Sequence, residues 1–247
     1  MSVEGTAALA RLEEFWNIAG RARLQAQFAV ASEMQLVERM PIESLREVLL
    51  QYRYFTLAFT TDIAAVIGRC MPSRLRSLLG ELLHDELGQG DPEQAHPRLY
   101  DKFLISIGAI AATASESALH EQMHPVVRDL LADLSRRTRD ASISYAIGLR
   151  GMGGECVCGV YFDELYKHVV HHAYVAEHRA TIDWTFWDIH AGHHDVEHDT
   201  KTRAAVGDLA RAGRLDIEQL AAGFEHGVQS WNRFWRTLYE THVAPAH

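Results

Sequence analysis

Apolar residues recur at helical spacing along almost the whole chain, and no segment shows the alternation of apolar and polar residues that marks a β-strand. The pattern predicts long helices at 42–69, 73–88 and 216–240, with two more at 5–18 and 21–39. Other helices are expected from about residue 95, at 126–137, at 141–174 with a kink near residues 151–154, and at 177–194 or beyond. We expect an all-α bundle of seven to nine helices, with residues 1–247 forming a single domain.

Composition and charge narrow the class of protein. Hydrophobic residues make up 47% of the 247 residues and charged residues 23%, which is typical of a globular protein with a full core. The net charge of −9 argues against a nucleic-acid partner. The longest apolar run without a charge, residues 103–115, is too short to span a membrane. Three cysteines form no disulfide framework and no signal peptide is recognised, so a cytoplasmic location is expected. A homodimer remains open.

A cluster of histidines and acidic residues is the main chemical signal in the sequence. The segment from Trp184 to Asp199 reads WTFWDIHAGHHDVEHD, and Asp195 and His198 are three residues apart. Residues at this spacing share one face of a helix. Imidazole and carboxylate groups together suit a first-row transition metal, with iron, manganese and zinc all open. His190 and His194 are further candidates in the same segment.

Two other segments offer partners for this cluster. Glu86 ends one expected helix and His96 begins the next, with a glycine-rich turn between them. Such a turn allows two ligands to converge without sharing a helix. Glu155 lies among glycines, cysteines and apolar residues, and a buried carboxylate in these surroundings needs a cation, a proton or a metal ion.

These motifs resemble those of the heme-oxygenase-like diiron oxidases and oxygenases, also described as iron-containing redox enzymes. The stretch ELGQGDPEQAHPRLY, from Glu86 through His96 to Tyr100, is similar to the first motif of that family. Glu155 matches a glutamate of a central helix, and DVEH, from Asp195 to His198, matches the end of the last motif. The resemblance covers about residues 10–240 in helix order.

The resemblance implies a site for two Fe(II) ions with O2 as co-substrate. It implies the ligands Glu86, His96, Glu155, His190, Asp195 and His198. One position departs from the family pattern, because the residue four before the aspartate is Ala191 rather than histidine. His190, five residues before it, fits if a π-bulge absorbs one extra residue, and His194 is the alternative.

The resemblance also implies an oxidation of a small molecule in a biosynthetic pathway. N-oxygenation of an amine or amino-acid-like substrate is placed first, because the ten-residue separation of Glu86 and His96 resembles the N-oxygenating branch. Desaturation or C–C fragmentation is the alternative, and an external reductant is expected. Tyr161, Phe162 and Tyr54 are candidate pocket residues, and Arg98 and Arg150 are candidate partners of a substrate carboxylate.

Three other interpretations remain open, and a fourth is disfavoured. A ferritin-like site would use the pairs Glu81/His84 and Glu121/His124. A thiaminase-like, metal-free enzyme of the TenA type would use Cys156 or Cys158 as its nucleophile. Heme oxygenase activity is disfavoured because no histidine precedes His84 to serve as an axial ligand. A metal-storage or scaffold protein would have neither a substrate pocket nor O2 consumption.

Overall fold

The computed structural model describes residues 3–29, 31–152, 155–190 and 194–242, and every regular element within these ranges is helical. Side chains are described there except at residues 3–8, 27–29, 155–158, 194–199 and 242. The long helices are α1 (Val3–Ala29), α3 (Ile42–Arg69), α4 (Arg74–Glu86), α5 (His96–Ser106), α7 (Pro125–Asp140), α9 (Glu155–Val169), α12 (His194–Arg211) and α13 (Ile217–His242). The expected all-α class and the expected number of long helices are confirmed.

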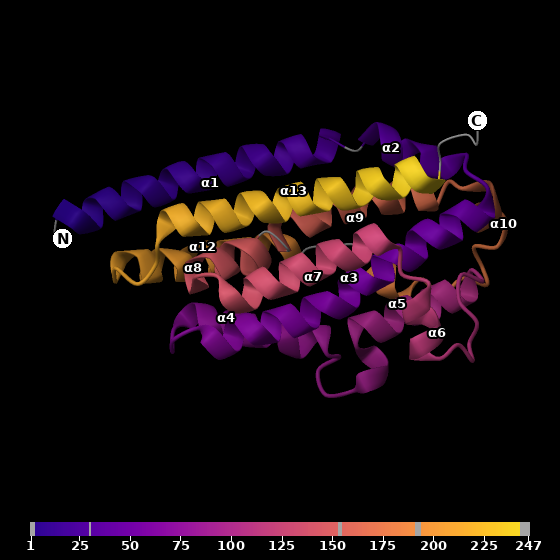
Figure 1. Ribbon diagram of the computed structural model, residues 1–247, viewed down its shortest axis with the longest axis horizontal. Coiled ribbons are helices and arrows are strands. Elements are labelled where there is room, and N and C mark those ends of the chain that lie inside the picture. The colour runs from indigo at the N-terminus through magenta and orange to yellow at the C-terminus, as the bar shows by residue number, and fades with distance from the viewer. Residues whose placement is uncertain (1–2, 30, 153–154, 191–193, 243–247) are drawn as a thin grey trace.

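Short elements connect the long helices. They are α2 (Ala31–Gln35), α6 (Glu116–Glu121), α8 (Ile143–Ala146), α10 (Ala173–Glu177), α11 (Thr185–His190), the 3₁₀ turns η1 (Leu36–Glu38) and η2 (Pro92–Gln94), and the π-helical segment η3 (Ile147–Met152). Figure 1 shows the long helices running roughly along one axis, with the start of α1 and the end of α13 at opposite ends.

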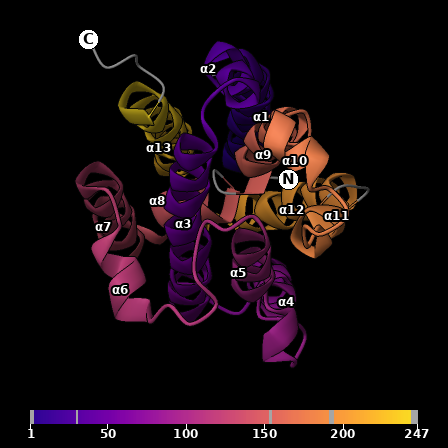
Figure 2. The ribbon, with the colours of Figure 1, turned by 90° about the vertical axis from the view of Figure 1, so that its right-hand side faces the viewer.

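Helix α3 lies in the middle of the bundle. It contacts α4, α5, α7, α13 and η3. In the end view of Figure 2, α7 and α13 lie on one side of α3, and α4 and α5 lie on the other. The helix begins after Pro41 and ends at Arg69, just before Pro72, as the sequence predicts. Its buried residues include polar ones, and each is paired; Gln51, for example, donates to Gln122 O (3.0 Å) and accepts from His124 N (2.8 Å).

Helix α13 lies so close to α8 and to segment η3 that only glycine fits at two positions. A Cβ atom at Gly148 would lie 2.0 Å from Leu220 O, and one at Gly223 would lie 2.1 Å from Tyr145 O. The buried η3 leads toward Glu155, the first residue of α9. The two glycines therefore allow α13 to pack directly against the backbone that precedes α9.

Two stretches differ from the expectation. Helix α1 continues through Gly20 to Ala29, whereas the sequence predicted separate helices at 5–18 and 21–39. Space is open around Gly20, so nothing in its surroundings requires a break there. The expected helix at 177–194 is wrong over its first part, because α11 begins only at Thr185, where Asp183 accepts from the backbone N–H of Thr185 (3.0 Å).

None of the helices in the described ranges combines the length and the apolar character that a membrane span requires.

Candidate metal centre

A tight loop returns the chain from the end of α4 to the start of α5, and thereby brings Glu86 and His96 together. Three consecutive residues of this loop have positive φ: Gly88 (79°), Gln89 (56°) and Gly90 (100°). A Cβ atom at Gly88 would lie 2.2 Å from Asp91 O, so this position requires glycine for space as well as for conformation. The reversal places Glu86 Oε1 3.2 Å from His96 Nδ1 although ten residues separate them in sequence.

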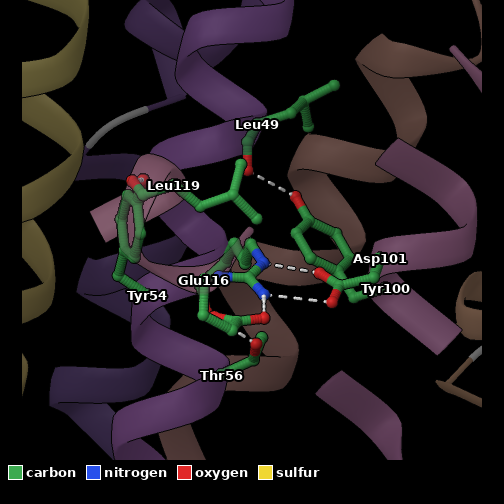
Figure 3. Close-up of polar contacts among 8 residues, drawn as sticks. Leu49, Tyr54, Thr56, Tyr100, Asp101, Glu116 and Leu119 are labelled. Atoms are coloured by element: carbon green, nitrogen blue, oxygen red, sulfur yellow. Dashed lines mark hydrogen bonds and ion pairs between the residues drawn. The ribbon is translucent and has the colours of Figure 1, made fainter. Parts of the chain in front are cut away.

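Helix α5, which begins at His96, is fastened to α3 by buried polar contacts (Figure 3). The Arg53 guanidinium donates two hydrogen bonds to the Asp101 carboxylate, at 2.6 and 3.1 Å, and one to Glu116 of α6, at 2.6 Å. The Tyr100 hydroxyl donates to Leu49 O at 2.9 Å. Bidentate pairing of arginine with a carboxylate constrains orientation as well as distance, so these contacts hold α5 in place against α3.

The third member of the cluster comes from α11. His190 Nδ1 lies 2.6 Å from Phe186 O, one helical turn earlier. Donation to this carbonyl selects the tautomer in which Nε2 carries the lone pair. The imidazole packs against the rings of Phe186 and Phe162, with centroid distances of 4.4 and 5.0 Å, and lies 4.9 Å from the His96 ring.

Glu86, His96 and His190 therefore converge on one point from α4, α5 and α11. One ligand atom from each lies within 4.8 Å of the others, and among the described residues this is the one group of three or more potential ligands so arranged. Bonds of about 2.1 Å place the ligand atoms of one ion up to about 4.2 Å apart, so small side-chain rotations suffice. The arrangement fits a first-row transition metal.

One nitrogen of the His96 ring has a hydrogen-bonding position that no described residue fills. Its Nδ1 atom is buried and, among the described residues, lacks a hydrogen-bond partner, although Glu86 Oε1 is 3.2 Å away. The two atoms are close but not aligned for a hydrogen bond. Burial opposes protonation of His96, but Glu86 and Asp85 outweigh it and raise the pKa of the imidazole. The pocket therefore attracts a positive charge.

Comparison with known proteins identifies the family. The model of the iron-containing redox enzymes, which are heme-oxygenase-like proteins, matches residues 46–232. The chain belongs to this family. No curated protein matches the sequence.

Solved structures agree on the fold of this iron-containing redox enzyme. A CADD-like protein of unknown function from Nostoc punctiforme is 15% identical with a TM-score of 0.73, over 94% of this chain and 100% of that one. A TenA homolog from Pseudomonas syringae pv. tomato is 13% identical with a TM-score of 0.66, over 92% and 91% of the two chains. At these identities the likeness concerns the heme-oxygenase-like fold alone.

The other three expected ligands of this family member lie at the starts of helices. Glu155 is the first residue of α9, and Asp195 and His198 lie in the first turns of α12, which begins at His194. Their side chains are outside the described residues, as are residues 191–193, so their part in the site stays a prediction. The choice between His190 and His194, and the expected π-bulge after His190, stay open for the same reason.

Several residues singled out in the sequence have other partners. Arg150 is paired with Asp62, and Arg98 with Glu93. The Tyr54 hydroxyl donates to Leu119 O and that of Tyr161 to Asn232. Of the candidate pocket residues, Phe162 contacts a candidate ligand, since its ring centroid lies 5.0 Å from that of His190.

The residues of the ferritin-like alternative, Glu81/His84 and Glu121/His124, do not form a metal-binding cluster in the described part of the structure. His124 Nδ1 accepts from Val126 N and caps α7, and Glu121 is exposed on α6. Glu81 and His84 are both exposed on α4. The side chains of Cys156 and Cys158, on which the thiaminase-like alternative depends, lie outside the described residues.

Two contributors to the site escaped the sequence interpretation. One is the backbone carbonyl of Phe186, which orients His190. The other is Asp85, whose Oδ2 lies 4.0 Å from His96 Nε2. The first contact could have been predicted, because Phe186 and His190 are four residues apart and so lie one helical turn from each other. The second depends on the path of the loop and has no signature in sequence.

Proposed function

We propose that this iron-containing redox enzyme is a non-heme diiron oxygenase. Two Fe(II) ions would be held by Glu86, His96, Glu155, His190, Asp195 and His198, with O2 as co-substrate. The observation that carries the proposal is the convergence of Glu86, His96 and His190 from three helices on one partly buried point.

Bound iron would supply the redox chemistry with O2. The protein's own groups orient the ligands and supply the negative charge that would bind iron. The Glu86 carboxylate supplies negative charge beside His96 Nδ1, and the Phe186 carbonyl orients the His190 imidazole. The rings of Phe186 and Phe162 cover one side of His190 and exclude water from it. Low exposure of the Glu86 and His96 side chains, 15% and 13%, strengthens the electrostatic attraction for a cation.

The proposed reaction is N-oxygenation of a small amine or amino-acid-like substrate. The ten-residue separation of Glu86 and His96, which resembles the N-oxygenating branch, supports this choice. Transfer of one oxygen atom from O2 to an amine nitrogen leaves the second as water and consumes two electrons and two protons. An external reductant must therefore act with the enzyme. Oxidative desaturation or C–C fragmentation is the alternative on the same site.

Anaerobic titration with Fe(II) tests the site. The wild-type chain should bind two ions, and exposure of the loaded protein to O2 should produce a transient visible absorption and O2 consumption. Glu86→Gln should reduce the iron content, whereas Glu81→Gln, which removes an exposed carboxylate from the same helix, should not. Failure of the wild-type protein to bind iron would refute the proposal.

A metal-free enzyme of the TenA type is the second candidate, supported by the structural similarity to a TenA homolog. It predicts that Cys156→Ser or Cys158→Ser abolishes turnover while Glu86→Gln leaves iron-independent activity in place. The diiron proposal predicts the reverse. Comparison of these three variants with and without iron separates the two functions.

A further inference from the structure

We propose that Asp85 is a positioning residue of the metal centre, which orients His96 from the side opposite the ion and is itself held by Gln89. The inference rests on the metal site proposed above and adds two residues that do not bind the ion.

The His96 imidazole lies between two carboxylates. Its Nδ1 atom faces Glu86 Oε1 at 3.2 Å, and its Nε2 atom faces Asp85 Oδ2 at 4.0 Å. A histidine that binds a metal through one nitrogen commonly directs its other N–H to a carboxylate or carbonyl, which fixes the tautomer and makes the ligand nitrogen more basic. At 4.0 Å the two groups attract each other electrostatically but do not form a direct hydrogen bond. A small rotation of His96 toward the position of the ion would change this distance.

The second oxygen of Asp85 is also engaged. Gln89 Nε2 donates to Asp85 Oδ1 at 2.7 Å, so the carboxylate is held at one oxygen and faces His96 with the other. Asp85 is partly exposed, with 42% of its side-chain surface accessible. A carboxylate that exposed would otherwise rotate freely in solvent, and the amide of Gln89 restricts it.

The backbone conformation of Gln89 supports a functional role for its side chain. With φ of 56°, it is the single non-glycine residue with positive φ among the described residues, and it lies between Gly88 and Gly90. Glycine would adopt this conformation without strain. Strained residues of this kind concentrate at functional sites. The amide that reaches Asp85 is the contact that glycine at this position would lack.

The test compares metal affinity in four proteins: wild type, Asp85→Asn, Gln89→Gly and Glu81→Gln. Dissociation constants for Co(II) and for anaerobic Fe(II) are measured by competition with a chromophoric chelator, together with the visible spectrum of bound Co(II) and the melting temperature of the metal-free proteins. Glu81→Gln is the matched control, because it removes one negative charge from α4 at an exposed position one helical turn before Asp85.

We expect Asp85→Asn to weaken metal binding about tenfold with unchanged stoichiometry and a changed Co(II) spectrum. Gln89→Gly should also weaken binding, by less, while its metal-free melting temperature stays the same or rises because the strain is relieved. Glu81→Gln should bind as the wild type does. Loss of affinity without loss of stability in Gln89→Gly is a result that a purely structural role would not give.

Four results would overturn the proposed role of Asp85. Equal affinity of Asp85→Asn and Glu81→Gln would show that only overall charge matters. Loss of one ion from Asp85→Asn would make Asp85 a ligand instead of a positioning residue. A wild-type protein that binds no metal would refute the metal site and the positioning role together, whereas tight wild-type binding unaffected by Asp85→Asn and Gln89→Gly would refute the role alone.

Discussion

Two polar clusters inside this bundle differ in whether their charges are balanced within the cluster. Asp62 and Arg150 are almost completely buried, with side chains 0% and 2% exposed, and their carboxylate and guanidinium lie 2.5 Å apart. Ser135 donates to the other oxygen of Asp62 at 2.7 Å. This cluster, the α3–η3 ion pair, contains its own cation and its own anion.

The cluster of Glu86, His96 and His190 consists of one carboxylate and two imidazoles, and Glu86 is paired with His96, which is charged only when it is protonated. Burying a carboxylate beside groups that carry no permanent positive charge is costly, and proteins retain such a carboxylate where a proton or a metal ion supplies the missing charge. The comparison shows that burial of polar groups does not by itself mark a site. The unbalanced cluster is the functional candidate, and the balanced one stabilises the fold.

Breaking the balanced pair should have the largest effect on stability. Arg150→Met leaves the Asp62 carboxylate buried without a cation, and we expect a loss of about 3–5 kcal/mol in the free energy of unfolding. Urea denaturation followed by circular dichroism measures it. The double variant Arg150→Met with Asp62→Leu should recover most of the loss, since it removes the unpaired charge as well. A double variant as unstable as the single one would contradict the assignment.

The unbalanced cluster should respond in the opposite way. Glu86→Gln removes a desolvated charge, so the metal-free variant should be at least as stable as the wild type. At a free metal concentration one hundred times the dissociation constant, the wild type should gain about 2.7 kcal/mol of stability, and the variant should lose this gain. Thermal unfolding with and without Co(II) measures both. A destabilised metal-free variant would mean that Glu86 has a structural partner instead.

The sequence predicted the long helices well because they depend on local periodicity and on the residues at their ends. Helix α3 begins and ends where Pro41 and Pro72 indicate. Helices α1 and α11 were predicted less well. Gly20 resembles a helix end in sequence, but α1 continues through it, and only tertiary surroundings distinguish the two cases.

Three of the six expected ligands have described side chains, and how far their proximity could be predicted depends on their separation along the chain. Glu86 and His96 are joined by a short loop whose glycines indicated a reversal, so their proximity could be predicted from sequence. His190 reaches them from a helix more than ninety residues later, and only the packing of α11 on α5 brings it there. The contact of Asp85 with His96 depends on the path of the loop, which periodicity does not encode, whereas the contact of Phe186 with His190 follows from their spacing of four residues within α11.

A third cluster consists of the buried Arg53 guanidinium and the carboxylates of Asp101 and Glu116. Its contribution to stability should be intermediate, because one of its two carboxylates is exposed. Asp101→Asn should cost about 1.5–3 kcal/mol, since it removes a charge-assisted bidentate contact with a buried guanidinium. Glu116→Gln should cost less than about 1 kcal/mol, because the Glu116 side chain is 76% exposed and solvent screens its contact. Urea unfolding of the two variants, with amide hydrogen exchange in α5, tests this order. Equal losses would show that exposure does not separate them.

The smallest effect should come from a balanced surface cluster that contains a histidine. Tyr145 donates to His226 Nδ1 at 2.6 Å, and His226 Nε2 lies 3.4 Å from Asp133 Oδ2. Burial, reinforced by Arg137, outweighs the attraction of Asp133 and lowers the pKa of His226 below its ordinary value of 6.5. As the pH falls below 6.5, the unfolded chain binds a proton that the folded chain resists, so folding loses stability until the pH passes the lowered pKa.

Above pH 6.5 the histidine is neutral in both states and contributes no pH dependence. His226→Gln should therefore flatten the decline of melting temperature between pH 6.5 and 5, and leave its value at pH 8 nearly unchanged. A variant whose acid limb is as steep as that of the wild type would contradict the assignment of this pH sensitivity to His226.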